Sequence, residues 1–495
     1  MCARALYRAF IVMFTCGNIL SAAAEVYLSS LLGPAFSYGI ELPSYTGAVS
    51  DSKALDYSVV KEVQFVGNTK TRSDILFREL QFATGDSLPA DQLEELVAAG
   101  RRNLMNTQLF NFVDAEVDTR KYPEVVVTYA VVERWYTWPI PILEIKERTL
   151  NEWLQSPSLS KLNYGISLVV GNFSGRNERF TLQLKMGYMH KYSISYRSPY
   201  LNKAQNLAWG FEGGMERSRE MAYLTEENQQ LFYKSNAFVF RKNFGQFSMY
   251  YRPGVFGRHS FHFGIQQYGF ADTLKILNPR FVPGRHSWFN YMNAGYEFIY
   301  EKRDNKAYPL RGNYGSFSAR RLGMGLLTDE KMDVNVIQAS WRMYRELAPR
   351  WFFANGLMMK WSDGSNMSYF NQQGLGLSNN LVRGYHDYVI DGQSFVVLKT
   401  SGKYELLPKR ISRLPFISSE KFSRIHYAMY LNVFADAGYA YDRYFFDNNP
   451  LNNKILAGCG FGVDFVTYYD KVFRTEFSVN RHGEYGVFLH LMAPF

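Results

Sequence analysis

The sequence predicts a mainly β fold, a 16-stranded antiparallel transmembrane β-barrel over residues 138–495 that is preceded by one small α+β domain. Aromatic residues make up 17% of the chain, with 36 Tyr and 39 Phe, as expected for strands with aromatic girdles at two membrane interfaces. Beyond residue 24, no stretch approaches the roughly 18 consecutive apolar residues of a spanning helix. From residue 138 onward, apolar and polar residues alternate, which is typical of strands with two unlike faces. A large soluble array of β-sandwiches is the alternative.

The first 24 residues have the pattern of a secretory signal peptide. Two arginines precede a short apolar run, and three small alanines end at residue 24. A lipoprotein leader lipidated at Cys16 and a single membrane anchor are the alternatives. Residues 25–57 form a linker or lead-in segment to which the sequence assigns no role.

The sequence of residues 58–134 predicts a compact domain with the element order β-α-α-β-β. A first strand ends at Gly67-Asn68, and Pro89 opens the second of two helices whose apolar residues recur at helical spacing. Two strands follow, at residues 110–117 and 125–132.

The glycine-asparagine turn, the helix pair, Leu109-Phe110 and the last strand ending Val132-Glu133-Arg134 give this domain a specific likeness. It resembles a polypeptide-transport-associated (POTRA) domain. The resemblance implies a domain that binds client chains by adding a strand to a sheet edge. We expect that client-binding edge at Val125, Val126 and Val127. A generic small α+β domain is the alternative.

The barrel region shows its alternation most clearly in the segments Phe180–Met186 and Tyr192–Arg197. In a membrane barrel the apolar face of such strands meets lipid and the polar face lines the lumen. About 354 residues shared among 16 strands leave about 22 residues for each strand and its connection, a plausible size for such a barrel.

Five motifs follow one another along the barrel region. They are the turn Arg303–Gly312, the loop sequence Val382-Arg383-Gly384-Tyr385, the strand Lys403–Pro408, the strand Phe434–Gly438 and the terminal strand Val487–Phe495. In this order they resemble the motifs of the BamA/TamA superfamily, the bacterial surface antigen family. The resemblance as a whole covers residues 58–495.

The resemblance implies that a loop folds into the barrel and that Arg383 pins it to the inner wall. The predicted loop-anchoring cluster in the lumen consists of Arg383, Gly384, Tyr385, Glu405 and Asp436. The two acids alternate with apolar residues on their strands, so we expect both to point into the lumen. There a guanidinium can pair with a carboxylate through two parallel hydrogen bonds. An arginine on an exposed loop is the alternative.

The chain ends in an alternating strand whose last residue is Phe495. A terminal phenylalanine on such a strand is the usual signal for barrel insertion. We therefore predict an insertion signal made of Phe495, Leu491 and Leu489.

Enzymatic and nucleic-acid-binding functions find little support in the sequence. The net charge is +10, but the basic residues are scattered, whereas a nucleic-acid binder usually gathers them on one face. Motifs for a serine hydrolase, a zinc protease or a nucleotide site are absent, so we expect no enzyme, no cofactor and no metal site. A catalytic site at the barrel rim, built from His386-Asp387 or His482, is the alternative to exposed polar loop residues.

The resemblance implies an outer-membrane protein assembly, insertion or secretion factor of a Gram-negative-type bacterium, with the POTRA domain in the periplasm. Its partners would be outer-membrane lipids, unfolded client polypeptides and accessory periplasmic proteins or lipoproteins, and no nucleic acid. A structural surface antigen or pore without a client-handling role is the second hypothesis.

Overall fold

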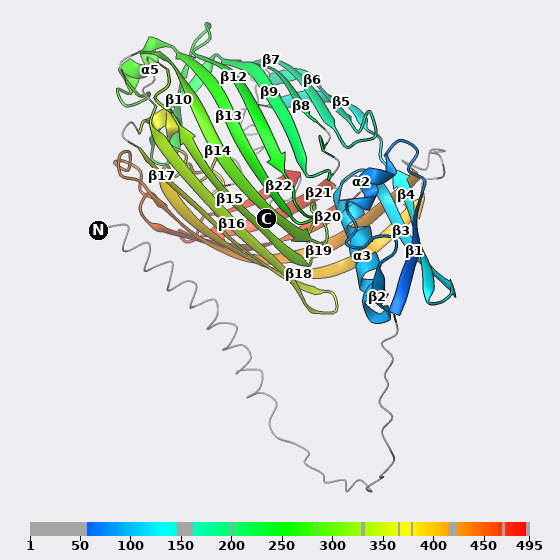
Figure 1. The fold of residues 1–495 in the computed structure, drawn as a ribbon. Helices are drawn as coiled ribbons and strands as arrows, with labels where there is room; N and C mark the ends of the chain where they lie inside the picture. Colours follow the sequence, from blue (N-terminus) through cyan, green and yellow to red (C-terminus); the bar gives the residue numbers. More distant parts are fainter. Residues whose placement is uncertain are drawn as a thin grey trace, which may run out of the picture. The chain divides into compact units, whose positions relative to one another are not determined.

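A computed structural model (Figure 1) describes residues 57–491 apart from 146–161, 199, 203, 285, 328–331, 365–366, 378–379, 414, 416–422 and 468–470. The predicted signal peptide, the lead-in segment up to residue 56 and Phe495 lie outside the described residues. None of the described helices is long and apolar enough to cross a membrane.

The N-terminal α+β domain has the predicted order of elements plus one short strand. Its elements are β1 (Tyr57–Val66), α2 (Ser73–Phe77), β2 (Ser87–Pro89), α3 (Ala90–Asn106), β3 (Phe110–Lys121) and β4 (Glu124–Glu133). The additional strand β2 has only three residues, too few to show a periodicity in the sequence. The four strands form one sheet in the order β2-β1-β4-β3, in which β1 and β4 are parallel.

Helix α3 packs on this sheet through one apolar stripe. Leu93, Val97 and Leu104 recur at helical spacing and are buried against the sheet. Gly100 lies on the same face, where an added Cβ would meet the Tyr129 hydroxyl at 2.4 Å. That hydroxyl donates a hydrogen bond to the Val97 carbonyl at 3.1 Å. The glycine therefore lets a tyrosine of the sheet reach the backbone of the helix.

The expected position of the client-binding edge at Val125, Val126 and Val127 is wrong. These residues lie on β4, which pairs with β1 on one side and with β3 on the other. An interior strand has its backbone groups already engaged on both sides, so it cannot accept another strand. The outer strands of this sheet are β2 and β3.

The rest of the described chain confirms the predicted 16-stranded antiparallel barrel. The sheet runs in the order β22-β21-β20-β19-β18-β17-β16-β15-β14-β13-β12-β9-β8-β7-β6-β5, and Figure 1 shows it curving round on itself. Its strands are β5 (Thr137–Ile145), β6 (Leu162–Gly171), β7 (Arg179–Gly187), β8 (Met189–Arg197), β9 (Leu207–Ser218), β12 (Phe240–Tyr251), β13 (Gly257–Phe270), β14 (Trp288–Arg303), β15 (Gly312–Leu322), β16 (Val334–Ala348), β17 (Trp351–Gly364), β18 (Ser394–Arg413), β19 (Arg424–Tyr441), β20 (Ile455–Thr467), β21 (Lys471–Asn480) and β22 (Tyr485–Leu491).

Alternation along these strands separates an apolar outer face from a polar lumen. Phe211, Phe247 and Phe263 lie side by side on β9, β12 and β13, and each is 44–51% exposed. The next residue on β12, Ser248, is buried and bonds His262 at 2.8 Å. A row of exposed phenylalanines beside a row of buried polar groups is the arrangement expected of a barrel in lipid.

The barrel has two unlike ends. The turns at residues 172–178 and 304–311 belong to the end that contacts the α+β domain, which we call the domain end. The opposite end, the loop end, carries longer connections. These include the hairpin β10 (Glu220–Glu226) and β11 (Gln229–Lys234), helix α5 (Asp272–Leu277) and the short helix η2 (Tyr369–Asn371).

Glu133 holds the loop of the α+β domain that touches the barrel turns. Its carboxylate accepts hydrogen bonds from the amides of Lys70 and Thr71, at 3.1 and 2.6 Å, and from the Thr69 hydroxyl at 3.0 Å. Burial alone would raise the pKa of Glu133, but these hydrogen bonds hold that pKa below its ordinary value. The adjoining Arg72 amide bonds the Gly175 carbonyl of the barrel turn at 3.0 Å.

A depressed pKa means that the Glu133 carboxylate stabilises the fold above the ordinary glutamate pKa and loses this contribution as the pH falls through its folded-state pKa. We expect Glu133→Gln to lower the stability of the domain at pH 7 by about 1–3 kcal/mol, and by less at pH 3. The measurement is the urea midpoint of protease resistance of this domain in the full-length protein. The exposed Glu94→Gln serves as control, and an equal loss at both pH values would contradict the assignment.

Candidate functional site

The connection between β17 and β18 folds into the barrel. We call residues 380–393 of this connection the inner loop. Val382, Arg383 and Tyr385 are each less than 5% exposed. The Tyr385 amide closes a turn on the Val382 carbonyl at 3.1 Å, and Gly384 has a φ of +95°, which favours glycine at that position.

Arg383 and Asp436 form a buried bidentate ion pair. The Arg383 Nε donates to Asp436 Oδ2 at 2.8 Å, and Nη2 donates to Oδ1 at 2.5 Å. The backbone amide of Arg383 also donates to Oδ2 at 3.2 Å. The guanidinium lies over the Phe434 ring, 3.8 Å from its centroid, and bonds the Ser401 hydroxyl at 3.3 Å. One carboxylate on β19 therefore binds both the side chain and the backbone of the inner loop.

Two glycines make room for this loop on the inner wall. A Cβ on Gly458 of β20 would lie 1.9 Å from the Arg383 carbonyl oxygen, and one on Gly438 of β19 would lie 2.5 Å from the Val382 side chain. Any larger residue would push the loop away from Asp436. The sequence contained this signal in Gly458-Cys459-Gly460, whose glycines otherwise look like ordinary strand residues.

Glu405 is not part of this cluster, although we expected it there. The strand register pairs Asp436 with Lys399, whereas Glu405 pairs with Tyr430. Tyr430 is six residues from Asp436 on β19, which is about 20 Å along a strand. Glu405 instead accepts a hydrogen bond from the Tyr430 hydroxyl at 3.3 Å. Arginine and glutamate therefore lie at different levels of the barrel.

A second segment enters the lumen from the domain end. The turn at residues 304–311, which we call the inner turn, carries the buried Tyr308. Its hydroxyl donates to Asp464 Oδ2 at 2.7 Å, and Arg474 donates to the same carboxylate at 2.6 and 2.8 Å. The Lys403 ammonium lies 4.1 Å from the centre of the Tyr308 ring. The sequence marked this turn as a motif but gave its tyrosine no role.

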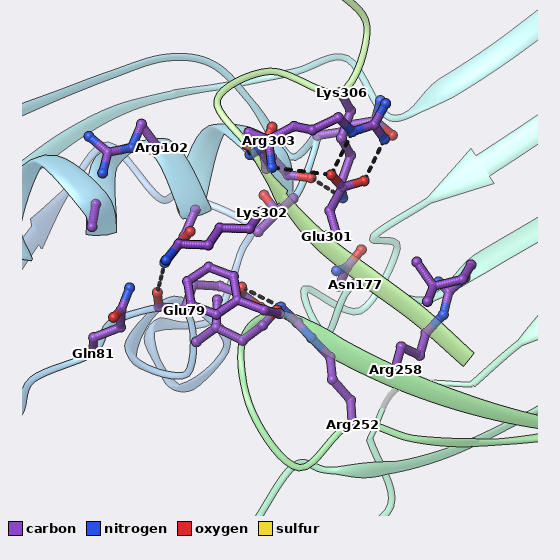
Figure 2. A pocket seen from close by; sticks show the side chains of 18 of the residues that line it. Glu79, Gln81, Arg102, Asn177, Arg252, Arg258, Glu301, Lys302, Arg303 and Lys306 are labelled. Carbon is purple, nitrogen blue, oxygen red and sulfur yellow. Dashed lines mark hydrogen bonds and ion pairs between the residues drawn. The ribbon is translucent and has the colours of Figure 1, made fainter. Parts of the chain in front are cut away.

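A basic chamber of about 970 Å³ lies at the domain end, between the α+β domain and the barrel turns (Figure 2). Ten basic and four acidic side chains line it. Two of the arginines are neutralised in fork-like pairs, Arg252 by Glu79 at 2.6 and 2.9 Å and Arg303 by Glu301 at 2.7 and 2.5 Å. Burial lowers the pKa of Lys306, whose ammonium donates to the Asn106 carbonyl at 2.7 Å. The chamber keeps an excess of positive charge.

The remaining predicted residues are distributed over the loop end and the last strand. Leu489 and Leu491 are 64% and 61% exposed on the outer face of β22. Their role as an insertion signal stays a prediction. Asp387 and His482 are exposed, but His386 is buried, so it is not a residue of the rim.

Comparisons with known proteins agree with this geometry. Residues 58–134 match the family model POTRA, described as a surface antigen variable number repeat. A solved structure of BamA from Haemophilus ducreyi lacking POTRA domains 1–3 matches with a TM-score of 0.50 and 15% identity, over 88% of this chain and 84% of that chain. Residues 58–134 thus form a POTRA domain, and the barrel that follows has the same fold as the BamA barrel.

Two further solved structures are similar to this chain at lower scores. CdiB from Escherichia coli has a TM-score of 0.48 at 12% identity, over 88% of this chain and 75% of that one. CdiB from Acinetobacter baumannii has a TM-score of 0.45 at 11% identity, over 88% and 73%. No curated protein sequence matches the chain.

Replacing Arg383 by alanine leaves the Asp436 carboxylate buried without its partner. Breaking a buried ion pair in this way costs on the order of 3–5 kcal/mol. We therefore expect Arg383→Ala to lower the temperature at which the folded barrel converts to its unfolded mobility on SDS gels. The exposed Arg481→Ala is the matched control. If both variants convert at the wild-type temperature, the ion pair does not hold the loop.

Proposed function

We propose that this protein resides in the outer membrane and inserts or secretes client polypeptides, with its POTRA domain in the periplasm. The observation that carries the proposal is the joint placement of a POTRA domain, a basic chamber and a barrel blocked from both ends by its own segments. A client received by the domain would meet the chamber before it meets the lumen.

The inner loop and the inner turn argue against a simple open pore. Each is tied by a buried carboxylate to the inner wall, Asp436 for the loop and Asp464 for the turn. Both carboxylates lie on adjacent strands, β19 and β20. A client polypeptide would instead leave the barrel sideways, between the two terminal strands of the sheet, β5 and β22. Within the sheet, β5 pairs with β6 and β22 pairs with β21. Separation of β5 from β22 would leave the two anchors in place.

The outer strand β3 is the better candidate for client binding. At its start, Arg101 of α3 donates to the Val113 carbonyl at 2.6 Å and so covers part of the edge. The remainder, Ala115–Lys121, has β4 on its inner side and carries exposed polar residues. An extended client would add to this strand through main-chain hydrogen bonds, with side chains adding selectivity.

A structural surface protein without clients is the second candidate, and the loop end favours it. Asn228, at the tip of the β10–β11 hairpin, bonds the side chains of Asn449 and Asn452 and the Val389 carbonyl at 2.9–3.2 Å. At the same end of the barrel, buried aromatic residues of β12, β13 and β14 pack with Phe281 and Tyr369 of two connections. These contacts join the loops of the loop end into one structured surface, as a surface protein without clients would need. Accessory periplasmic proteins or lipoproteins stay a prediction.

A photo-crosslinking residue at Glu116 on the outer part of β3 should capture unfolded outer-membrane polypeptides in living cells. The same residue at Glu94, exposed on α3, should capture fewer, because helical backbone groups cannot pair with a client strand. The measurement is the yield of crosslinked polypeptide per molecule of each variant.

A second experiment depletes the protein from cells and measures the levels of all other surface proteins. If equal crosslinking at Glu116 and Glu94 is accompanied by unchanged levels of all other surface proteins, the client-handling role is wrong and the surface-protein role is favoured.

A further inference from the structure

Three potential metal ligands from distant parts of the chain meet inside the barrel. His386 comes from the inner loop, Glu476 from β21 and His490 from β22. The Nε2 atoms of His386 and His490 lie 3.4 and 3.5 Å from the same oxygen, Glu476 Oε1. Ligand atoms of all three residues lie within 4.8 Å of one another. The cluster plays no part in the function proposed above.

The two buried members of this cluster lack ordinary hydrogen bonds. The side chains of His386 and Glu476 are 5% and 1% exposed. Among the described residues, none forms a well-aligned hydrogen bond with either ring nitrogen of His386 or with either carboxylate oxygen of Glu476, although both histidines lie at ion-pairing distance from Glu476 Oε1. Buried polar atoms are almost always paired, and here His386 Nδ1 and Glu476 Oε2 have neither a hydrogen bond nor an ion pair among the described residues, which leaves the cluster able to take a ligand.

The distances suit a small metal ion. With metal–ligand bonds of about 2.0–2.1 Å, neighbouring ligand atoms of a tetrahedral zinc site lie about 3.3 Å apart. The two His–Glu distances already match this spacing. His490, whose side chain is 21% exposed, is the ligand with room to adjust.

The surroundings of the cluster orient one of its ligands. Phe488 stacks on the His386 ring with centroids 3.8 Å apart, which fixes the plane of that imidazole. Arg383 lies three residues before His386, but its charge is already compensated by Asp436. The Glu476 carboxylate supplies the negative charge that a divalent ion requires.

We propose that His386, Glu476 and His490 bind one divalent transition-metal ion, for which zinc is the best match. Two imidazoles and one carboxylate are a common ligand set for zinc, with a fourth position left to water. The ion would tie the inner loop to β21 and to β22, the terminal strand of the sheet. It would therefore add to the attachment of the inner loop that the Arg383–Asp436 pair provides, and it would oppose movement of β22.

This site does not depend on the proposed function, and its test is direct. The full-length protein, folded in detergent and treated with a chelator, is titrated with zinc chloride. Bound zinc per chain is measured after desalting, together with the unfolding temperature of the barrel. We expect about one zinc ion per chain and a higher unfolding temperature, because a ligand that binds only the folded state stabilises it.

Two variants and a matched control locate the ion. His490→Gln and Glu476→Gln should weaken zinc binding by at least about tenfold, since loss even of an outer partner of a metal ligand costs that much. His482→Gln changes an exposed histidine in the turn before β22 and should bind zinc as the wild type does. Folding of each variant is checked by its heat-modifiable mobility.

The proposal is overturned if the folded wild type retains no zinc. It is equally overturned if His490→Gln and Glu476→Gln retain as much zinc as His482→Gln, because the ion would then be adventitious. The crosslinking at Glu116 is unaffected by either result, so failure of the metal site is distinguishable from failure of the proposed function.

Discussion

A guanidinium group can be buried inside a barrel only if a carboxylate compensates it, because moving an unpaired charge out of water costs several kcal/mol. Arg383 meets this constraint with Asp436, which receives two side-chain hydrogen bonds and one from the backbone. The position of the inner loop follows from this pair. The glycines at 438 and 458 let the backbone of the loop approach the wall closely enough for the pair to form.

The rest of the lumen is organised in a similar way. Asp464 binds Tyr308 of the inner turn and Arg474 of the neighbouring strand, so the domain end also carries a segment held by a buried carboxylate. The β19–β21 wall thus provides both attachment points, while β5 and β22 lie at the two ends of the sheet order. This separation of anchoring strands from terminal strands is what makes opening between β5 and β22 compatible with a plugged lumen. The proposed metal site around Glu476 would link the inner loop to the terminal strand β22 through a bound ion.

Much of the fold could be predicted from local pattern alone. Alternation such as that at Phe247 and Ser248 reveals a strand with one lipid face, and the turn at Gly67-Asn68 marks the small domain. Pairing between distant strands could not be predicted in this way. Val125–Val127 looked like an exposed edge because the sequence does not show that β4 lies parallel to β1.

The site was predictable only in part for the same reason. Arg383 and Asp436 each lie in a motif that can be recognised in the sequence. Whether Glu405 reaches them depends on the strand register, which pairs Asp436 with Lys399 and Glu405 with Tyr430. Tyr308 had a motif but no visible partner. His386, Glu476 and His490 lie in three segments and match no spacing rule, so only the folded chain brings them together.

The central claim is that the Arg383–Asp436 pair, rather than general packing, holds the inner loop in the barrel. A double-mutant cycle of Arg383→Ala, Asp436→Ala and the combined variant measures the coupling between the two side chains by the free energy of unfolding. For a close, desolvated charge pair the account predicts a coupling of at least about 1.5 kcal/mol. Coupling near zero, with the two single losses simply adding, would contradict it.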